Sequence, residues 1–294
     1  MDELISVIII GLSVGGLYAL LALGLAMVFA ILEMINFAHG ELIAVTGYCM
    51  YFLLLTGMPF IVVVLFAVFA AGIGAVLMER IAFRPIRNAF LTTGIITSFG
   101  LQMILHQGWA NAISPLRLPV KRPIWLIKFW PIGDAGIATY QAIAVILTVV
   151  SLISLTIFLR KTTTGLAMRA AAADFPVTRL MGIRANRVIA TAFAISGLLA
   201  GIAAFLYIAQ RGSIEPNIGL TPLIKAFIAL VFGGMASLTG AVVGGLVFGF
   251  LEIGLRTFLP ESVLPFQAAI TYFIVILVLL RWPNGLISIF AKRE

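Results

Sequence analysis

The sequence contains few charged residues, one cysteine and two histidines, and each shortage excludes a class of protein. Charged side chains make up 10% of the 294 residues and hydrophobic ones 62%, whereas soluble domains use roughly 25% and 45–50%. The single cysteine, Cys49, excludes an intrachain disulfide and a thiolate cluster for a metal. No G-x-x-x-x-G-K-[ST] or H-E-x-x-H run is present, so the sequence offers no P-loop and no zinc-protease motif. We therefore expect a non-catalytic membrane protein with no cofactor or metal of its own.

Long apolar runs take the place of the missing polar sequence, and the mean hydropathy is +1.18. About 20 apolar residues cross the roughly 30 Å hydrocarbon core, and only helices satisfy their own backbone there. We predict an all-α polytopic membrane protein, a single transmembrane domain over residues 1–294 with about eight to nine transmembrane or re-entrant helices. The two shortest segments could span fully or re-enter. The predicted segments are 4–32, 41–57, 59–79, 91–113, 138–159, 188–210, 220–236, 240–259 and 264–281.

The basic residues predict an orientation, because cytoplasmic loops carry an excess of Lys and Arg. Twelve of the nineteen fall in segments 80–90, 160–187 and 281–294, which lie on one side if the segments alternate. The N-terminus is then outside and the C-terminus cytoplasmic, although the basic loop 114–131 weakens the bias. The sequence pI of about 10.1 is thus a topology signal, and we expect a lipid bilayer, not a nucleic acid, as the partner.

The spacing of the segments suggests an internal repeat. Segments one to four and six to nine register at an offset of about 180 residues, and the odd fifth segment reverses the second set, as in the inverted repeats of many transporters. The repeats would be 1–113 and 188–281. The alternative is that any protein with nine spans can be divided in this way.

The stretch INFAHGE (35–41) gathers polar and turn-forming residues between two apolar runs. Asn36 or His39 could cap a helix that begins near Gly40, and Glu41 would complement the positive end of its dipole. One interpretation is an ordinary interfacial turn. The other is a half-helix end that lines a path for a polar substrate, since broken helices at membrane depth face a cavity.

Two ionisable residues fall within predicted membrane segments, where burying one costs about 2.5–3.5 kcal/mol on insertion scales. Lys225 opens the seventh segment and Glu252 lies inside the eighth. We predict an intramembrane charge pair in which Glu252 binds Lys225 or Arg256.

Four blocks carry a resemblance to a known family: GGLYALLALGLAMVFAILEMINFAHGELIAVTGY (15–48), TTTGLAMRAAAADFPVTRLMGIRANRVIATAFAISGLLAGIAAFL (162–206), KAFIALVFGGMASLTGAVVGGLVFG (225–249) and RWPNGL (281–286). Together they resemble the LivH-type permeases of branched-chain amino acid ABC importers. The resemblance implies one of two membrane subunits in the bacterial inner membrane. Its partners would be a second, LivM-like permease, two cytoplasmic ATPase subunits that bind ATP, and a periplasmic substrate-binding protein.

The loop 160–187 is where this resemblance places the contact with the ATPase. Thr162 to Thr164 offer an N-cap for one short helix, Asp174 an N-cap for a second, and Gly182 can end it. The family's coupling helix would lie around 170–181, although its general motif Glu-Ala-Ala-x-x-x-Gly is absent in strict form. The expected coupling residues are Arg169, Ala171, Ala172, Asp174, Arg179 and Gly182. The alternative is a basic loop that only sets orientation.

The function implied by the resemblance is ATP-driven alternating access, with Asn36, His39 and Glu41 shaping the pathway or its gate. Other readings stay open: an ABC permease for urea, amides or another small amino acid, an ion-coupled secondary carrier, or a channel. The sequence leaves open the substrate, a substrate site within the membrane, and pairing as a heterodimer or homodimer.

Overall fold

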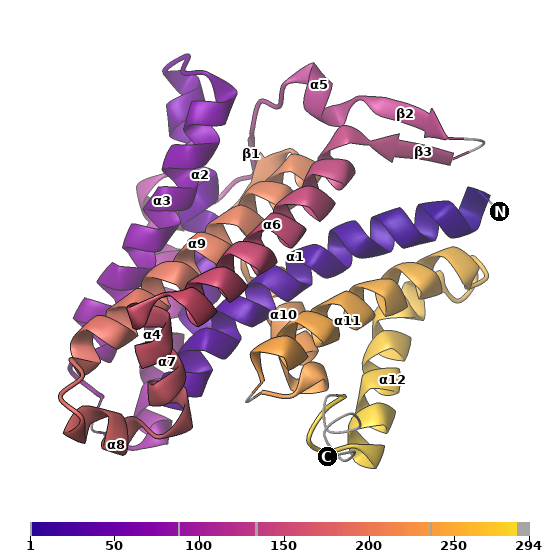
Figure 1. Cartoon of the computed structure of the whole chain (residues 1–294). Helices are drawn as coiled ribbons and strands as arrows, with labels where there is room; N and C mark the ends of the chain where they lie inside the picture. Colours follow the sequence, from indigo (N-terminus) through magenta and orange to yellow (C-terminus); the bar gives the residue numbers. More distant parts are fainter. Residues whose placement is uncertain (1, 88, 133–134, 236, 287–294) are drawn as a thin grey trace.

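The computed structural model describes residues 2–87, 89–132, 135–235 and 237–286, and it is almost entirely helical (Figure 1). Every predicted apolar segment forms a helix. The elements are α1 (Asp2–Leu32), η1 (Phe37–Gly40), α2 (Glu41–Leu55), α3 (Phe60–Met78), η2 (Glu79–Phe83), α4 (Leu91–Ala112), β1 (Leu118–Pro119), α5 (Ile124–Ile127), β2 (Phe129–Ile132), β3 (Ala135–Ala138), α6 (Thr139–Lys161), α7 (Thr163–Ala173), α8 (Phe175–Leu180), α9 (Ala185–Arg211), β4 (Ser213–Ile214), α10 (Leu220–Gly233), α11 (Leu238–Phe258), η3 (Leu264–Phe266) and α12 (Gln267–Arg281).

Seven helices in the described part of the chain are long and apolar enough to cross a membrane. They include α2 together with the 3-10 turn η1 before it. The helix α10 has 14 residues, and a helix of that length rises only about 21 Å. The outward faces of α3, α4, α6 and α12 carry many exposed Ile, Leu and Phe side chains. Such faces suit hydrocarbon, so the chain is an all-α multi-pass membrane protein, as the sequence predicts.

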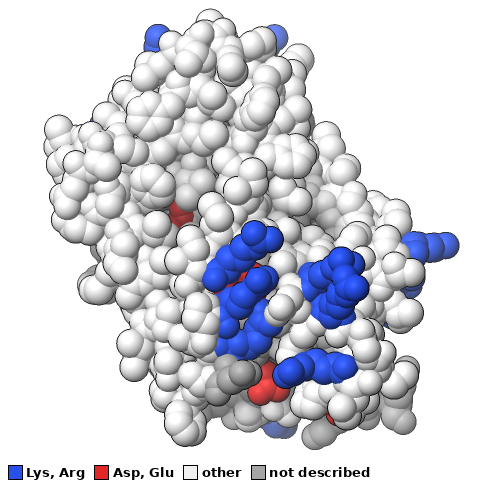
Figure 2. Space-filling view, turned by 90° about the vertical axis from the view of Figure 1, so that its left-hand side faces the viewer, with Lys and Arg blue, Asp and Glu red and all other residues white. Residues whose placement is uncertain are grey.

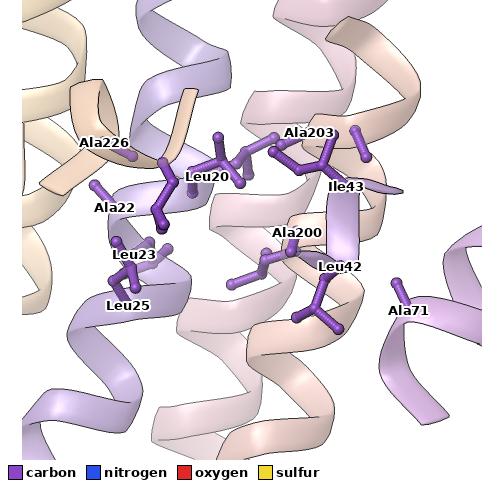
Figure 3. Close-up of a cluster of buried hydrophobic side chains, with 14 of the residues drawn as sticks. Leu20, Ala22, Leu23, Leu25, Leu42, Ile43, Ala71, Ala200, Ala203 and Ala226 are labelled. Carbon is purple, nitrogen blue, oxygen red and sulfur yellow. The ribbon is translucent and has the colours of Figure 1, made fainter. Parts of the chain in front are cut away.

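The core lies where α1 and α9 pass through the middle of the bundle (Figure 1). Leu20 and Leu23 of α1 are buried, as are Ala200 of α9 and Leu42 of α2 (Figure 3). Small residues alternate with leucines along both central helices, so the helices approach closely and fill the space between them.

The two central helices each pack along a glycine-bearing partner. Gly245 and Gly249 of α11 lie against the backbone of α1 at Ala19 and Gly15, and a Cβ at either glycine would overlap that backbone. On the other side, Gly197 of α9 lies against the backbone of α3 in the same manner. The G-x-x-x-G spacing in α11 therefore serves contacts within this chain.

The loops at the two ends of the bundle differ in character. At one end β2 and β3 form a hairpin, and β1 pairs with β4 through Leu118 and Ile214. At the other end α7 and α8 form a helical elbow (Figure 1). The helix α6 connects the two ends, so loops 113–138 and 160–187 lie on opposite sides of the bundle.

Candidate functional site

The polar stretch after α1 is a break between two helices. The helix α1 ends at Leu32, Glu33 has φ 54°, and α2 starts only at Glu41 after the turn η1. The predicted side-chain caps are wrong. Asn36, in the N-cap position of η1, makes no side-chain cap hydrogen bond. The N-cap position of α2 is held by Gly40, and His39 lies inside η1. The side chains of Asn36 and His39 are both buried.

His39 faces the two central helices. Its Nδ1 lies 3.4 Å from the Ser196 hydroxyl of α9, which donates a hydrogen bond of 2.8 Å to the carbonyl oxygen of Gly24 in α1. Gly24 leaves room for the imidazole, because a Cβ there would lie 3.1 Å from the ring. His39 Nε2 and Asn36 Oδ1 are buried and have no hydrogen-bond partner among the described residues. The imidazole thus joins the break to α1 and α9.

Glu41 faces the opposite direction, toward α4. Its carboxylate accepts hydrogen bonds from Trp109 Nε1 at 3.1 Å and from Gln102 Nε2 at 3.4 Å. The Trp109 ring stacks on Tyr48, with ring centroids 5.3 Å apart. Within the described residues no Lys, Arg or His nitrogen lies within 4 Å of this buried carboxylate. The three signature residues therefore surround the helix break, and they do not converge on one point.

The starts of α2 and α10 meet at this break. A Cβ on Gly40 would lie 2.9 Å from the carbonyl oxygen of Gly219, and a Cβ on Gly219 would overlap the Gly40 carbonyl. Gly40 and Gly219 occupy the N-cap positions of their helices. Only glycine permits this approach of the two backbones. The sequence analysis did not single out Gly219, because the contact joins residues far apart in the chain.

The structure pairs Lys225 of α10 with Glu252 of α11 and leaves Arg256 outside the pair. The Tyr18 hydroxyl of α1 donates to Glu252 Oε2 at 2.8 Å, and Lys225 Nζ lies 3.2 Å from the same hydroxyl. Gln267 of α12 donates to the Glu252 carbonyl oxygen at 2.8 Å. The adjoining cavity holds about 50 Å³, so within this chain it is too small for an amino acid. The cluster joins four helices.

The loop 160–187 has the local structure that the sequence predicts. The Thr162 hydroxyl accepts a hydrogen bond from Gly165 N at 2.9 Å and caps α7, and Asp174 Oδ1 accepts from Val177 N at 2.9 Å and caps α8. Gly182 has φ 80° and follows the end of α8. Both caps are confirmed.

The expected coupling residues of this loop lie on different faces. Arg169, Ala172, Asp174, Arg179 and Gly182 are exposed. Ala171, also expected to be a coupling residue, is buried against the bundle and is not on the surface of the loop. The side chains of Leu180 and Met181 at the tip are 86% and 77% exposed. The elbow therefore presents apolar and basic groups together.

Sequence reasoning missed a charge cluster where α3 ends. Glu79 is fully buried and binds Arg84 at 3.2 Å and Arg87 at 2.7 Å, and Arg87 donates to Asn186 Oδ1 of α9 at 2.6 Å. Burial lowers the pKa of the Arg87 guanidinium, nearby Arg84 and Arg179 lower it further, and Glu79 opposes them. The local signal was present, since Glu79 precedes these arginines by five and eight residues, but the partner on α9 is distant in the chain.

Arginines gather around a cleft of about 650 Å³ beside this cluster. Figure 2 shows basic side chains around a hollow on this face of the molecule. Five arginines line the cleft, from the end of α3, from α8 and from the start of α9: Arg84, Arg87, Arg179, Arg184 and Arg187.

These features define a polytopic helical membrane protein with a polar helix break inside the bundle and a basic elbow at one end. Residues 7–280 match the family described as "Branched-chain amino acid transport system / permease component". The chain belongs to this family.

Curated relatives extend over nearly the whole chain. The high-affinity branched-chain amino acid transport system permease protein LivH of Salmonella typhimurium is 34% identical over 292 residues, which cover 95% of this chain and 93% of the relative. The protein BraD of Pseudomonas aeruginosa, which has the same description, is 34% identical over 95% of this chain and 94% of its own. The ribose import permease protein RbsC of Escherichia coli is 26% identical over 51% of this chain and 41% of its own. No solved structure matches.

Proposed function

We propose that this chain is a permease subunit of an ABC importer for branched-chain amino acids and forms half of the translocation pathway. The observation that carries the proposal is the similarity to LivH and BraD, which extends over 95% of the chain. In this proposal the chain binds no ATP. A LivM-like permease, two cytoplasmic ATPase subunits and a periplasmic binding protein complete the importer.

The orientation in this proposal places the N-terminus outside and the C-terminus in the cytoplasm. The distribution of Lys and Arg supports it, and so does the arginine-lined cleft at the end of the bundle that carries α7 and α8. The hairpin β2–β3, at the other end, then faces the periplasm and the binding protein (Figure 1).

Coupling would act through the elbow of α7 and α8. Arg169 and Arg179 would meet acidic residues of the ATPase, and the exposed tip at Leu180 and Met181 would enter its groove. The helix α7 packs against α1, α6 and α9. A displacement of the elbow would therefore reach the two central helices directly.

The pathway in this proposal opens where α2 and α10 begin, and Asn36, His39 and Glu41 shape its gate. The packing supports an inverted repeat of 1–113 and 188–281: α10 lies on α1 and α11, while α2 lies on α9 and α3. The contact between Gly40 and Gly219 lies where the two halves would meet. Rigid-body movement of one half against the other would separate these helix starts.

An ion-coupled carrier is the second candidate, and one observation favours it. Glu41 is a buried carboxylate in a membrane segment, and among the described residues no Lys, Arg or His nitrogen lies within 4 Å of it, although His106 interacts with it electrostatically. Such groups commonly bind protons or ions in carriers. Urea, amides or another small amino acid are alternative substrates of the ABC permease.

Uptake of radiolabelled leucine into proteoliposomes separates these functions. The chain is reconstituted alone and with its permease, ATPase and binding-protein partners, with ATP or without it. Uptake that needs every partner and ATP is the expected result. Uptake by this chain alone, driven by a proton or sodium gradient, would refute the ABC permease and support the carrier.

A further inference from the structure

Two hollows follow one another along the seam between α3 and α9. The arginine-lined cleft, of about 650 Å³, lies where α3 ends and α9 begins. A second hollow of about 460 Å³ lies farther along the same helices and is apolar, and its lining includes Phe69, Ile73, Val76, Leu77, Ala194 and Leu198.

The same two segments of the chain line both hollows. The apolar hollow is lined by positions 69, 72, 73, 76, 77 and 80 of α3 and η2 and by 194 and 198 of α9, and the arginine-lined cleft includes 84 and 87 of the turn after η2 and 185–187 of α9. Residues three and four apart share a face of a helix. Arg80 lies at the junction, because it lines the apolar hollow on the turn next to Arg84. On α9 the lining residues Arg187, Ala194 and Leu198 keep this spacing, so an elongated ligand that passes Arg80 would reach from one hollow to the other.

The arginine-lined cleft has an excess of positive charge. Among the described residues, Glu79 is the one carboxylate within 4 Å of any of the five arginines, and it is buried beneath Arg84 and Arg87. Five guanidinium groups against one carboxylate leave four positive charges uncompensated. The planar fork of arginine donors matches the oxygens of a phosphate.

The depth of the cleft suits a lipid headgroup. The membrane segment of α3 ends at Phe83 and that of α9 begins at Ala185. Arg84, Arg87, Arg184 and Arg187 lie within about one turn of these ends, which is the level of the polar headgroups. Basic pockets between transmembrane helices at this level bind anionic lipid headgroups.

We propose that an anionic phospholipid binds along this seam, with its phosphate in the arginine-lined cleft and one acyl chain in the apolar hollow between α3 and α9. The ligand contacts both α8 and the bundle, because Phe175 lines the cleft together with Arg84 and Arg187. This inference is independent of the transported substrate.

Acidic side chains of a partner protein are the competing occupant of the cleft. They would account for the arginines, but they would leave the adjoining apolar hollow unexplained. Phe69, Ile73 and Leu77 beside that hollow are exposed on the outward face of α3, where hydrocarbon meets them. The lipid accounts for both hollows with one molecule.

Native mass spectrometry tests the proposal on the intact chain purified in detergent and titrated with phosphatidylglycerol or phosphatidylcholine. The test variant is Arg184→Gln/Arg187→Gln, since both side chains are exposed and removing them leaves no buried charge behind. Each arginine near the surface contributes about 1 kcal/mol to anionic lipid binding, which is about fivefold in affinity. The double variant is therefore expected to bind phosphatidylglycerol about 30-fold more weakly. The control Arg160→Gln/Lys161→Gln, which removes the same charge outside the cleft, is expected to stay within about twofold.

A second variant and a second ligand test the acyl-chain half of the site. Ala194→Leu fills the apolar hollow, so it is expected to weaken phosphatidylglycerol binding and leave the binding of glycerol phosphate unchanged. Glycerol phosphate or inorganic phosphate that binds as tightly as the phospholipid would refute a lipid site and indicate a free-anion site. Equal loss in the test and control pairs would also refute it. Loss of ATPase co-purification in the test pair with unchanged lipid binding would assign the cleft to a protein partner.

Discussion

Removing Lys225 should destabilise the bundle, because it leaves the Glu252 carboxylate without a cation between α10 and α11. Two unit charges in contact attract each other by about 5 kcal/mol at an effective dielectric constant near 20, and breaking a buried pair costs about 3–5 kcal/mol. A fifth of each side chain remains exposed, so we expect the lower end. Lys225→Met should lower the free energy of unfolding by about 3 kcal/mol.

The reverse substitution should cost less. In Glu252→Met the lysine keeps its charge, but its long stem lets the ammonium reach a more polar region, and the Tyr18 hydroxyl remains within 3.2 Å. We expect a loss of about 1–2 kcal/mol. The double variant Lys225→Met/Glu252→Met removes both charges and replaces them with apolar volume, which is often close to neutral. It should lie within about 1 kcal/mol of the wild type.

Unfolding in mixed micelles of increasing dodecyl sulfate content measures these differences in the free energy of unfolding. Labelling of Cys49 reports the opening of α2, since Cys49 is the one cysteine in the sequence. The matched control is Arg256→Met, which removes an exposed positive charge from α11 and should change the free energy by less than about 0.5 kcal/mol. The reasoning is refuted if Lys225→Met costs no more than this control. It is also refuted if the double variant costs the sum of the two single ones, because a coupled pair is non-additive.

Three further predictions concern the other contacts. Gly245→Ala should cost about 1–3 kcal/mol of unfolding free energy, because its Cβ overlaps the α1 backbone. The control Gly254→Ala, whose Cβ would have nothing within 4 Å, should be neutral or up to about 1 kcal/mol stabilising. Equal effects of the two substitutions would contradict the assigned packing. Trp109→Phe removes a donor to the Glu41 carboxylate and should cost about 1–3 kcal/mol in the same assay, and a result no larger than that of exposed Gln107→Ala would count against the contact. Asp174→Ala should weaken α8 by about 1 kcal/mol through loss of its cap and reduce leucine uptake per ATP hydrolysed in the reconstituted importer. Asp174→Ser keeps a capping oxygen and should retain coupling. Equal coupling in the two variants would show that the cap does not contribute to coupling.

Local signals in the sequence were sufficient for the helices and for the elbow. Each predicted apolar segment forms a helix, since hydrophobic length alone specifies a membrane helix. The caps by Thr162 and Asp174 were predictable because each bond spans three residues. The pairing of Lys225 with Glu252 was predictable because ionisable residues are rare within membrane segments, and few partners exist.

Signals that depend on tertiary packing were out of reach. Asn36 and His39 carry polar side chains that can cap a helix, but the tertiary fold places His39 against Ser196, which lies 157 residues farther along the chain. Trp109 reads as an interfacial aromatic residue, and its bond to Glu41 spans 68 residues. Ala171 belongs to a run of four alanines, and the sequence offers no means of telling which of them faces the bundle.

The two halves of the proposed repeat share their packing but not their polar groups. Gly40 and Gly219 define an offset of 179 residues, and at that offset Glu41 corresponds to Leu220, Lys225 to Thr46, and Glu252 to Ile73. Glycine contacts recur in both halves because they let the helices pack closely, whereas each of these charged residues occurs in one half only. In the pathway proposed above, a substrate between the halves would meet the Glu41 carboxylate with its amide and indole donors on one side and the Lys225–Glu252 ion pair on the other. Polar contacts also cross between the halves, because the Tyr18 hydroxyl donates to Glu252 and the Ser196 hydroxyl to the Gly24 carbonyl oxygen.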